Sequence, residues 1–266
     1  MYFLKSSLAI AAAMLAVTAQ AAPVVSVNGN ALALATAIGG SGITTSNATL
    51  TTNTTGGNGT FTGGAATVGF DDGIVLTTGT AACAGASGGS TVFCDGGGTV
   101  SELRFDFTST TGSVFFQYVF ASEEYNEFVG SQFNDSFALL LNDVNIALIP
   151  GGGGAVTINN VNCGSNSAFY RNNTGGGSTT ACPNLGLDIT YDGLTTVLTA
   201  SGTVGTGLNR FSFRIADVGD ARYDSGVFIR AGSFSSTNPN AVPEPGSLTL
   251  VGAALFGLAA VRRRKA

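Results

Sequence analysis

From Thr67 onward, short apolar segments alternate with glycine-rich turns, and this pattern constrains the fold more than any other feature of the chain. Within 103–107 and again within 211–215, large apolar residues alternate with polar ones. A period of two is typical of a β-strand with one buried and one solvated face. No internal segment shows a sustained helical period. The pattern therefore predicts an all-β protein, an antiparallel β-sandwich that is jelly-roll-like in the simplest case.

Other segments refine this prediction. Residues 114–121 are apolar on both faces apart from Gln117, which predicts a central strand. Two hairpins are predicted at two-residue turn signals, Asn142-Asp143 between 136–141 and 146–149, and Asp192-Gly193 between 189–191 and 194–198. The stretch 22–63 is rich in Ala, Thr, Asn and Gly and carries little hydrophobicity, so we expect edge strands or a flexible lead-in there. The sandwich is expected to span 64–236.

Two loops, 122–135 and 217–225, hold seven acidic residues. If successive strands reverse direction, both loops lie at the same end of the sandwich. Carboxylates gathered there repel one another unless a positive charge joins them. A structural Ca²⁺ held by carboxylate, Asn and backbone oxygens is one explanation. The alternative is ordinary turn capping together with salt bridging by Arg222. The candidate ligands are Glu123, Glu124, Asp135, Asp217, Asp220 and Asp224.

Three motifs in this region resemble the choice-of-anchor L domain. They are FDDGIVLTTG at 70–79, FASEEYNEFV at 120–129 followed by FNDSF at 133–137, and IADVGDARYDSGVF at 215–228. The resemblance spans about residues 65–235. It implies a secreted or surface β domain with varied C-terminal anchors, and it implies no established activity.

The first 21 residues predict a signal peptide. Lys5 precedes an apolar run at 8–17, and Ala19-Gln20-Ala21 has the small-x-small pattern that signal peptidase cleaves. A buried N-terminal helix is the alternative, but such a helix would have no solvent face. Cleavage after Ala21 is expected to export the chain.

The C-terminus has three parts in a fixed order. A linker at 237–246 contains Val242, Pro243, Glu244 and Pro245, whose two prolines exclude a helix and leave an extended peptide. The apolar stretch 247–261 would span roughly 22 Å as a helix, short of the ~30 Å hydrocarbon core, so it is a marginal anchor in the inner membrane. The basic tail 262–266 predicts a cytoplasmic C-terminus through Arg262, Arg263, Arg264 and Lys265.

This arrangement resembles the PEP-CTERM sorting signal of Gram-negative bacteria that make exopolysaccharide. An ordinary single-pass tail anchor is the alternative. The resemblance implies recognition by an exosortase, a membrane cysteine transpeptidase that cuts near Pro-Glu-Pro and then releases or re-attaches the mature protein. The chain is therefore expected to be a membrane-anchored intermediate first, and afterwards to lie at the cell surface or in the extracellular matrix.

Charge and composition exclude several functions. The full chain has 11 basic and 16 acidic residues. Removal of the signal peptide and the C-terminal sorting segment takes away Lys5, four C-terminal cations and Glu244. Six arginines and 15 acids remain, so the mature chain has a net charge of −9. Such a surface repels nucleic acid, so we expect no nucleic-acid partner. The chain has no histidine, which excludes Ser-His-Asp and Cys-His hydrolysis and the usual His-rich zinc or copper sites.

The four cysteines of this exported chain are expected to form disulfides. Four thiols allow three pairings, and short local loops favour Cys83 with Cys94 and Cys163 with Cys182. A metal site is the weaker alternative, because neither spacing matches a zinc finger.

Two functions from different classes remain open. The first is a non-catalytic surface or matrix protein that binds glycan or Ca²⁺, or that gives cohesion to exopolysaccharide. The second is a carboxylate-dependent glycan-active enzyme, which would draw its catalytic pair from Glu123, Glu124, Glu127 and Asp217. The chain has no Trp, the usual platform for sugar stacking. The candidate substitutes are Tyr125, Phe128 and Tyr223, for which packing within the loop is the alternative role.

Overall fold

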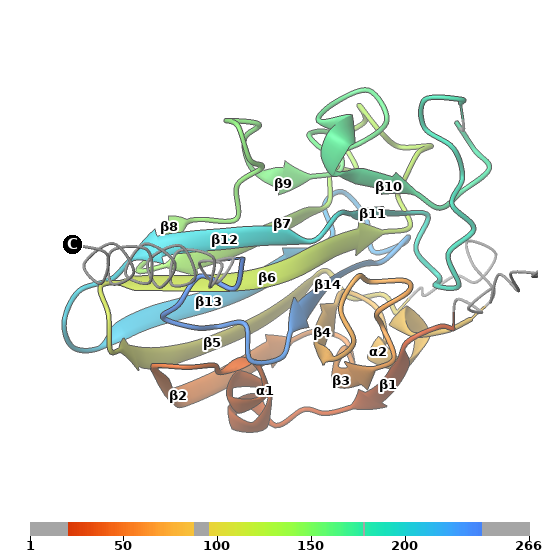
Figure 1. Ribbon diagram of the computed structural model, residues 1–266. Helices are drawn as coiled ribbons and strands as arrows, with labels where there is room; N and C mark the ends of the chain where they lie inside the picture. The colour runs from red at the N-terminus through yellow and green to blue at the C-terminus, as the bar shows by residue number, and fades with distance from the viewer. Residues whose placement is uncertain (1–20, 88–95, 178, 241–266) are drawn as a thin grey trace, which may run out of the picture.

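The computed structural model describes residues 21–87, 96–177 and 179–240. Within these residues fourteen strands form two antiparallel sheets that pack face to face as a sandwich (Figure 1). The predicted membrane segment 247–261 and nearly all of the predicted signal peptide lie outside the described residues. In the part of the chain that the structure describes, no helix is long and apolar enough to cross a membrane.

The larger sheet has the strand order β1-β3-β4-β14-β6-β11-β10, with β12 also paired to β6. Its strands are β1 (Val24–Val27), β3 (Asn58–Thr62), β4 (Gly73–Thr77), β6 (Ser113–Ser122), β10 (Tyr170–Asn172), β11 (Gly193–Thr195), β12 (Leu198–Thr203) and β14 (Ser225–Arg230). The smaller sheet has the order β2-β5-β13-β7-β8, with β9 paired to β7. Its strands are β2 (Ile43–Thr52), β5 (Val100–Ser109), β7 (Ser136–Leu141), β8 (Val144–Asn145), β9 (Val156–Thr157) and β13 (Asn209–Ala216). The short helices are α1 (Ala31–Ile38), α2 (Ala81–Ala84) and the 3₁₀ turn η2 (Ser167–Phe169).

Aromatic side chains fill the space between the sheets. Phe107 of β5 and Phe211 of β13 are fully buried and belong to the same core as Phe116 of β6. The rings of Phe116 and Phe211 meet edge to face at a centroid distance of 5.2 Å, an arrangement that adds about 0.5–1.5 kcal/mol to simple area burial. The predicted buried faces of 103–107 and 211–215 are therefore confirmed, while the opposite faces are solvated at Arg104 and Arg214 but bury Asp106 and Ser212.

Strand β6 is buried on both faces, as its sequence predicts. It pairs with β14 on one side and with β11 and β12 on the other. One face supplies Phe116 and Phe120 to the core between the sheets. The opposite face places Val119 and Ala121 in a second apolar cluster, which loop residues such as Val68 and Ile189 cover. A strand that is apolar on both faces thus lies where other parts of the chain pack against both faces of the larger sheet.

Residues 22–63 are part of the sandwich. β1 and β2 are the edge strands of their sheets, which confirms the edge-strand expectation for them, while β3 lies inside the larger sheet between β1 and β4. The prediction of a flexible lead-in is wrong, and so is the predicted start of the sandwich at residue 64, because the first strand of the sandwich is β1.

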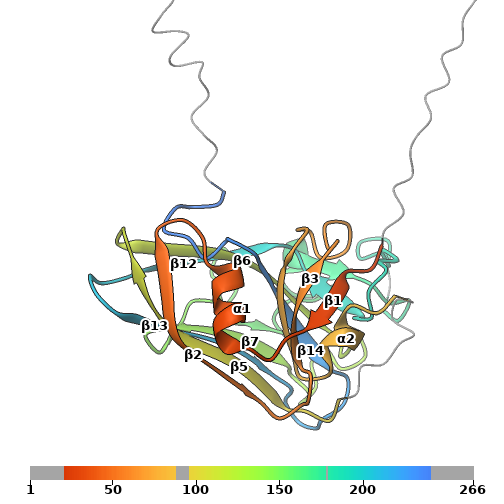
Figure 2. The same cartoon turned by 90° about the horizontal axis from the view of Figure 1, so that it is seen from below.

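Helix α1 is the unexpected element of this segment. Asn30 caps it by accepting a hydrogen bond from the Ala33 amide at 3.0 Å. Its Leu34 and Ile38 are fully buried in the core, and it packs against β2, β5 and β4, across the edge between the two sheets (Figure 2). Eight residues make little more than two turns, too few for a clear helical period in the sequence.

One predicted hairpin forms, although its return strand is 144–145 and not the predicted 146–149, and the other hairpin does not form. Asn142 and Asp143 both take positive φ values, 48° and 68°, and join β7 to the short β8 as a primed two-residue turn does. Asp192-Gly193, by contrast, does not join two paired strands. β11 pairs with β6 and β10 instead, and the Asn173 side-chain amide donates to the backbone carbonyls of residues 189 and 191.

A glycine is still needed at 193, but for another reason. An added Cβ there would collide with the ring of Tyr125 and the hydroxyl of Tyr170. The Asp-Gly pair therefore marks a close approach of two tyrosines to the backbone, and the predicted hairpin at 192–193 is wrong because both edges of β11 already have partners.

Candidate functional site

Both acidic loops lie at one end of the sandwich, as predicted. The loop after β6 begins where Ser122 is the register partner of Ser225, the first residue of β14. The Glu123 amide donates to the Asp224 carbonyl at 3.1 Å, and the Val218 amide donates to Asp135 Oδ1 at 2.9 Å. These contacts join the 122–135 loop to the 217–225 loop. We call the six carboxylates named as candidate ligands on these loops the acidic cluster.

Most of the acidic cluster is buried. Glu123, Glu124, Asp135, Asp217 and Asp224 are each at most 6% exposed, and only Asp220 is exposed to solvent. Buried carboxylates are costly unless they are paired, hydrogen-bonded or protonated. The charge of each carboxylate therefore depends on its burial, its hydrogen-bond partners and the charges near it.

Three members of the cluster accept hydrogen bonds from neighbouring strands and loops. The second oxygen of Asp135 accepts from the Ser225 hydroxyl at 2.7 Å. Asp224 accepts from the Gly96 amide at 3.0 Å, and Glu123 accepts from the Thr190 hydroxyl at 3.1 Å. Sequence reasoning did not identify Ser225 or Thr190 as partners, because Ser and Thr are common throughout this chain and carry no distinguishing spacing.

Glu124 differs from these three. Its side chain is 1% exposed, and its Oε2 atom has no hydrogen-bond partner among the described residues. Burial, reinforced by the negative charges of Asp135, Asp220, Asp217 and Glu123, raises the pKa of Glu124 to about 9. Glu124 is therefore protonated at neutral pH unless a cation joins the cluster.

Asp135 is perturbed in the same direction. Burial raises its pKa to about 6, although the hydrogen bonds from Ser225 and Val218 favour the charged form and oppose this rise. The cluster therefore gains negative charge in steps as pH rises, with Asp135 ionising before Glu124.

Arg222 does not neutralise the cluster within the part of the chain described. Its guanidinium is exposed and makes no ion pair there. Its backbone amide donates to Asp220 Oδ1 at 3.2 Å, which is the turn-capping role considered for such aspartates. Asp220 therefore caps its own turn, whereas salt bridging by Arg222 is not seen among the described residues.

The carboxylates do not stand in a ready metal cage. Among the described residues, no three Asp, Glu, His or Cys side chains come together in a group that could hold a metal ion. A bound cation would have to draw these side chains together or take backbone and amide oxygens as further ligands. The calcium prediction stays a prediction.

The aromatic residues of the acidic loops pack on one another. Tyr125 is fully buried against Tyr170, with ring centroids 4.8 Å apart. Phe128 lies between Phe133 and Tyr223, with centroid distances of 5.4 and 5.2 Å. Tyr125 therefore cannot stack on a sugar, and Phe128 and Tyr223 serve at least to pack their loops together.

One predicted disulfide is fully described. Cys163 and Cys182 are bonded, with their Cα atoms 5.7 Å apart. Cys83 is also disulfide-bonded, while Cys94 lies outside the described residues.

Comparison with known families agrees with the motifs. A family model described as the choice-of-anchor L domain matches residues 22–235, which extends the resemblance to the N-terminal strands. A second model, described as the PEP-CTERM protein-sorting motif, matches residues 241–265. That match contains Val242, Pro243, Glu244 and Pro245 together with the basic residues Arg262 to Lys265. No curated protein and no solved structure matches the chain.

Proposed function

Because the chain belongs to the choice-of-anchor L family and carries a PEP-CTERM motif, we propose that it is a non-catalytic structural or glycan-binding protein of the cell surface or exopolysaccharide matrix. The motif implies processing by an exosortase, and it indicates export and sorting to the cell surface. The observation that carries the proposal is the position of this motif, which follows the last described residues of the β-sandwich directly. The sandwich is thus the part that remains outside the cell.

The burial of the carboxylates supports a non-catalytic role. A glycosidase needs two accessible carboxylates roughly 5 to 10 Å apart across a cleft. Of the four residues that could form such a pair, Glu123, Glu124 and Asp217 are buried, and only Glu127 is exposed. Neither of the two cavities described in the structure is lined by a carboxylate.

The enzyme alternative has a direct test. Processed protein from the native host is incubated with the host exopolysaccharide, and new reducing ends are counted over a day. We expect no increase above the buffer control. Reducing ends that appear with the wild type and disappear with Glu124→Gln would overturn the non-catalytic proposal.

We also propose that Ca²⁺ binds at the acidic cluster. The supporting observation is Glu124, whose Oε2 atom is buried without a partner among the described residues and lies close enough to other carboxylates to feel their charge. A divalent cation there would allow Glu124 and Asp135 to ionise together.

The test of sorting uses the native host with and without its exosortase. We expect the wild-type protein at the surface or in the matrix in the first case, and an unprocessed membrane-bound form in the second. Deletion of 242–266 should send soluble protein to the periplasm or medium. A mature surface protein that still carries an intact peptide through residue 261 would contradict the proposal.

A further inference from the structure

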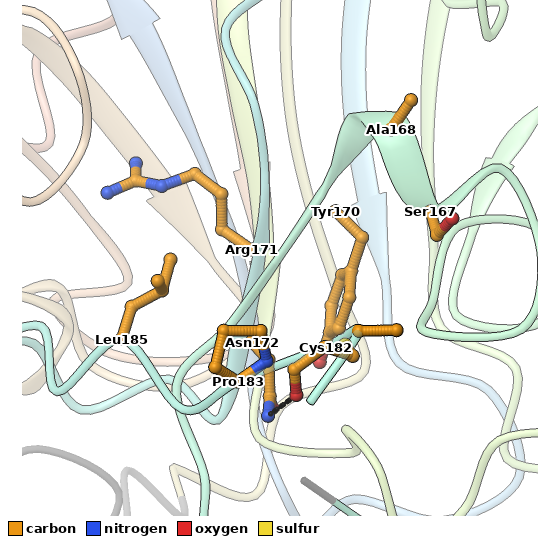
Figure 3. A pocket seen from close by; sticks show the side chains of 9 residues that line it. Ser167, Ala168, Tyr170, Arg171, Asn172, Cys182, Pro183 and Leu185 are labelled. Atoms are coloured by element: carbon orange, nitrogen blue, oxygen red, sulfur yellow. Dashed lines mark hydrogen bonds between the residues drawn. The ribbon is translucent and has the colours of Figure 1, made fainter. Parts of the chain in front are cut away.

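A cavity of about 340 Å³ opens beside the Cys163–Cys182 disulfide, well away from the acidic cluster in sequence (Figure 3). This volume lies in the range of small-molecule sites, roughly 300–1,000 Å³. β10 forms one wall, and the segment 181–185 forms another. Ala168, Pro183 and Leu185 make the lining largely apolar.

Arg171 is the only charged residue of this lining. Its guanidinium is half-buried and donates one hydrogen bond, to the Thr67 carbonyl at 2.7 Å. Among the described residues it has no other hydrogen-bond partner and no carboxylate partner. A guanidinium has five N–H donors, so most of them stay available to a ligand.

The surroundings of Arg171 favour an anion. Burial lowers the pKa of its guanidinium, since removal from water destabilises the charged form and no negative group in the described structure compensates. By contrast, Arg104 pairs with Glu102 at 2.9 Å and Arg210 pairs with Asp106 at 3.2 Å. A carboxylate in the cavity would supply the missing partner in a charge-assisted, bidentate geometry.

The walls of the cavity are held rigidly. The Asn172 side chain donates to the Cys182 carbonyl at 3.2 Å, and the Leu185 amide donates to the Asn172 carbonyl at 2.9 Å. The disulfide then fixes Cys182 to Cys163. A preformed site loses less entropy when its ligand binds.

We propose that this cavity binds a carboxylate-bearing sugar residue of an extracellular glycan, with Arg171 on the carboxylate and Pro183 and Leu185 of the segment 181–185 against the apolar face of the ring. The inference rests on the proposed function, because the glycan is the material in which the mature protein is expected to lie. The net charge of −9 restricts the ligand further, since a continuous polyanion would be repelled. A uronic acid at a chain end, or one spaced by neutral sugars, meets this condition.

The test is isothermal titration calorimetry with the protein as purified from the native host, whether or not it has been processed. The probes are two trisaccharides that each carry a single uronic acid at one chain end, galacturonosyl-maltose and glucuronosyl-maltose, together with neutral maltotriose and sodium acetate. We expect at least one uronate trisaccharide to bind at least about tenfold more tightly than both maltotriose and acetate. Equal affinity for acetate would assign the site to free carboxylates and overturn the saccharide assignment. Absence of binding by both uronates would overturn the inference.

Two variants of cavity residues and one control variant locate the binding. Arg171→Gln should weaken uronate binding about tenfold to a hundredfold, the usual effect of losing hydrogen bonds to a charged group. Arg214→Gln removes the same charge from an exposed position and should leave affinity unchanged. Leu185→Glu adds a repelling carboxylate at a residue that is 45% exposed, so it tests the cavity even if Arg171→Gln fails to fold. Wild-type affinity in Leu185→Glu would contradict the proposal.

The result of the binding experiment can be told apart from the result of the sorting experiment that tests the proposed function. If the protein reaches the surface through its exosortase but binds neither uronate, the inference fails alone. If binding occurs but the chain is not processed by the exosortase, the proposed function fails and the cavity assignment stands.

Discussion

Replacement of Glu124 by glutamine should stabilise the domain at neutral and alkaline pH. The folded-state pKa of Glu124 is about 9, against an ordinary value of 4.5. Because the folded value is the higher one, the folded state retains a proton that the unfolded state has already lost. This contribution to stability is complete below pH 4.5 and is lost progressively as pH rises towards 9. Glutamine is neutral in both states and removes this dependence.

The magnitude follows from the size of the shift. Each pH unit above the unfolded-state pKa costs about 1.4 kcal/mol, so the cost of Glu124 at pH 7 is at most about 3.4 kcal/mol. Solvent at the end of the sandwich screens part of this cost. We therefore expect Glu124→Gln to stabilise the protein by about 2 kcal/mol at pH 7, which raises the melting temperature by about 4–8 °C for a domain of this size.

The assay is a thermal melt of processed protein, followed by circular dichroism from pH 5 to pH 8 in the presence of a chelator. The difference between Glu124→Gln and the wild type should be small at pH 5 and should grow steadily with pH. Glu127→Gln, a neighbouring exposed carboxylate, is the matched control and should show no such growth. A difference that is independent of pH would refute a buried, protonated Glu124.

Three further predictions concern the calcium, the disulfide and the N-terminal segment. Calcium should raise the melting temperature by about 5–10 °C at a hundredfold excess over Kd, and magnesium should raise it less. Asp217→Asn should reduce the calcium shift, whereas Asp188→Asn, outside the acidic cluster, should leave it unchanged. Equal melting temperatures with calcium and with chelator would rule out the site. Replacement of Cys163 and Cys182 by serine should lower the free energy of unfolding by about 3 kcal/mol in urea titrations, for a loop with a sequence separation of 19. Removal of 22–63 should abolish the cooperative melt and the sharp β-type spectrum, because it deletes β1, α1, β2 and β3. A stable truncated domain would contradict the packing.

The sequence located the acidic cluster but not the state of its carboxylates. Alternating strand directions were enough to predict that the loops 122–135 and 217–225 share one end. Their sequence could not show that Ser225 would bond Asp135 while Glu124 Oε2 would be left without a partner among the described residues. Burial and hydrogen bonding depend on residues from several strands, so the order of ionisation follows only from the assembled structure. The same holds for Arg171, a lone arginine in a glycine-rich region whose sequence neighbours do not indicate a cavity.

By itself the sequence determined the properties that depend on local pattern. These are the period of two in β5 and β13, the two apolar faces of β6, the primed turn at Asn142-Asp143 and the order of the C-terminal sorting elements. Each of these properties depends on consecutive residues, because backbone preference and side-chain alternation act between neighbours in the chain. Tertiary structure decided the rest: it recruited 22–63 into the sandwich, gave Gly193 a packing role instead of a turn, and buried the acidic cluster. The physical reason is that strand pairing and burial depend on which distant segment occupies each sheet edge and each face, a choice that no single segment encodes.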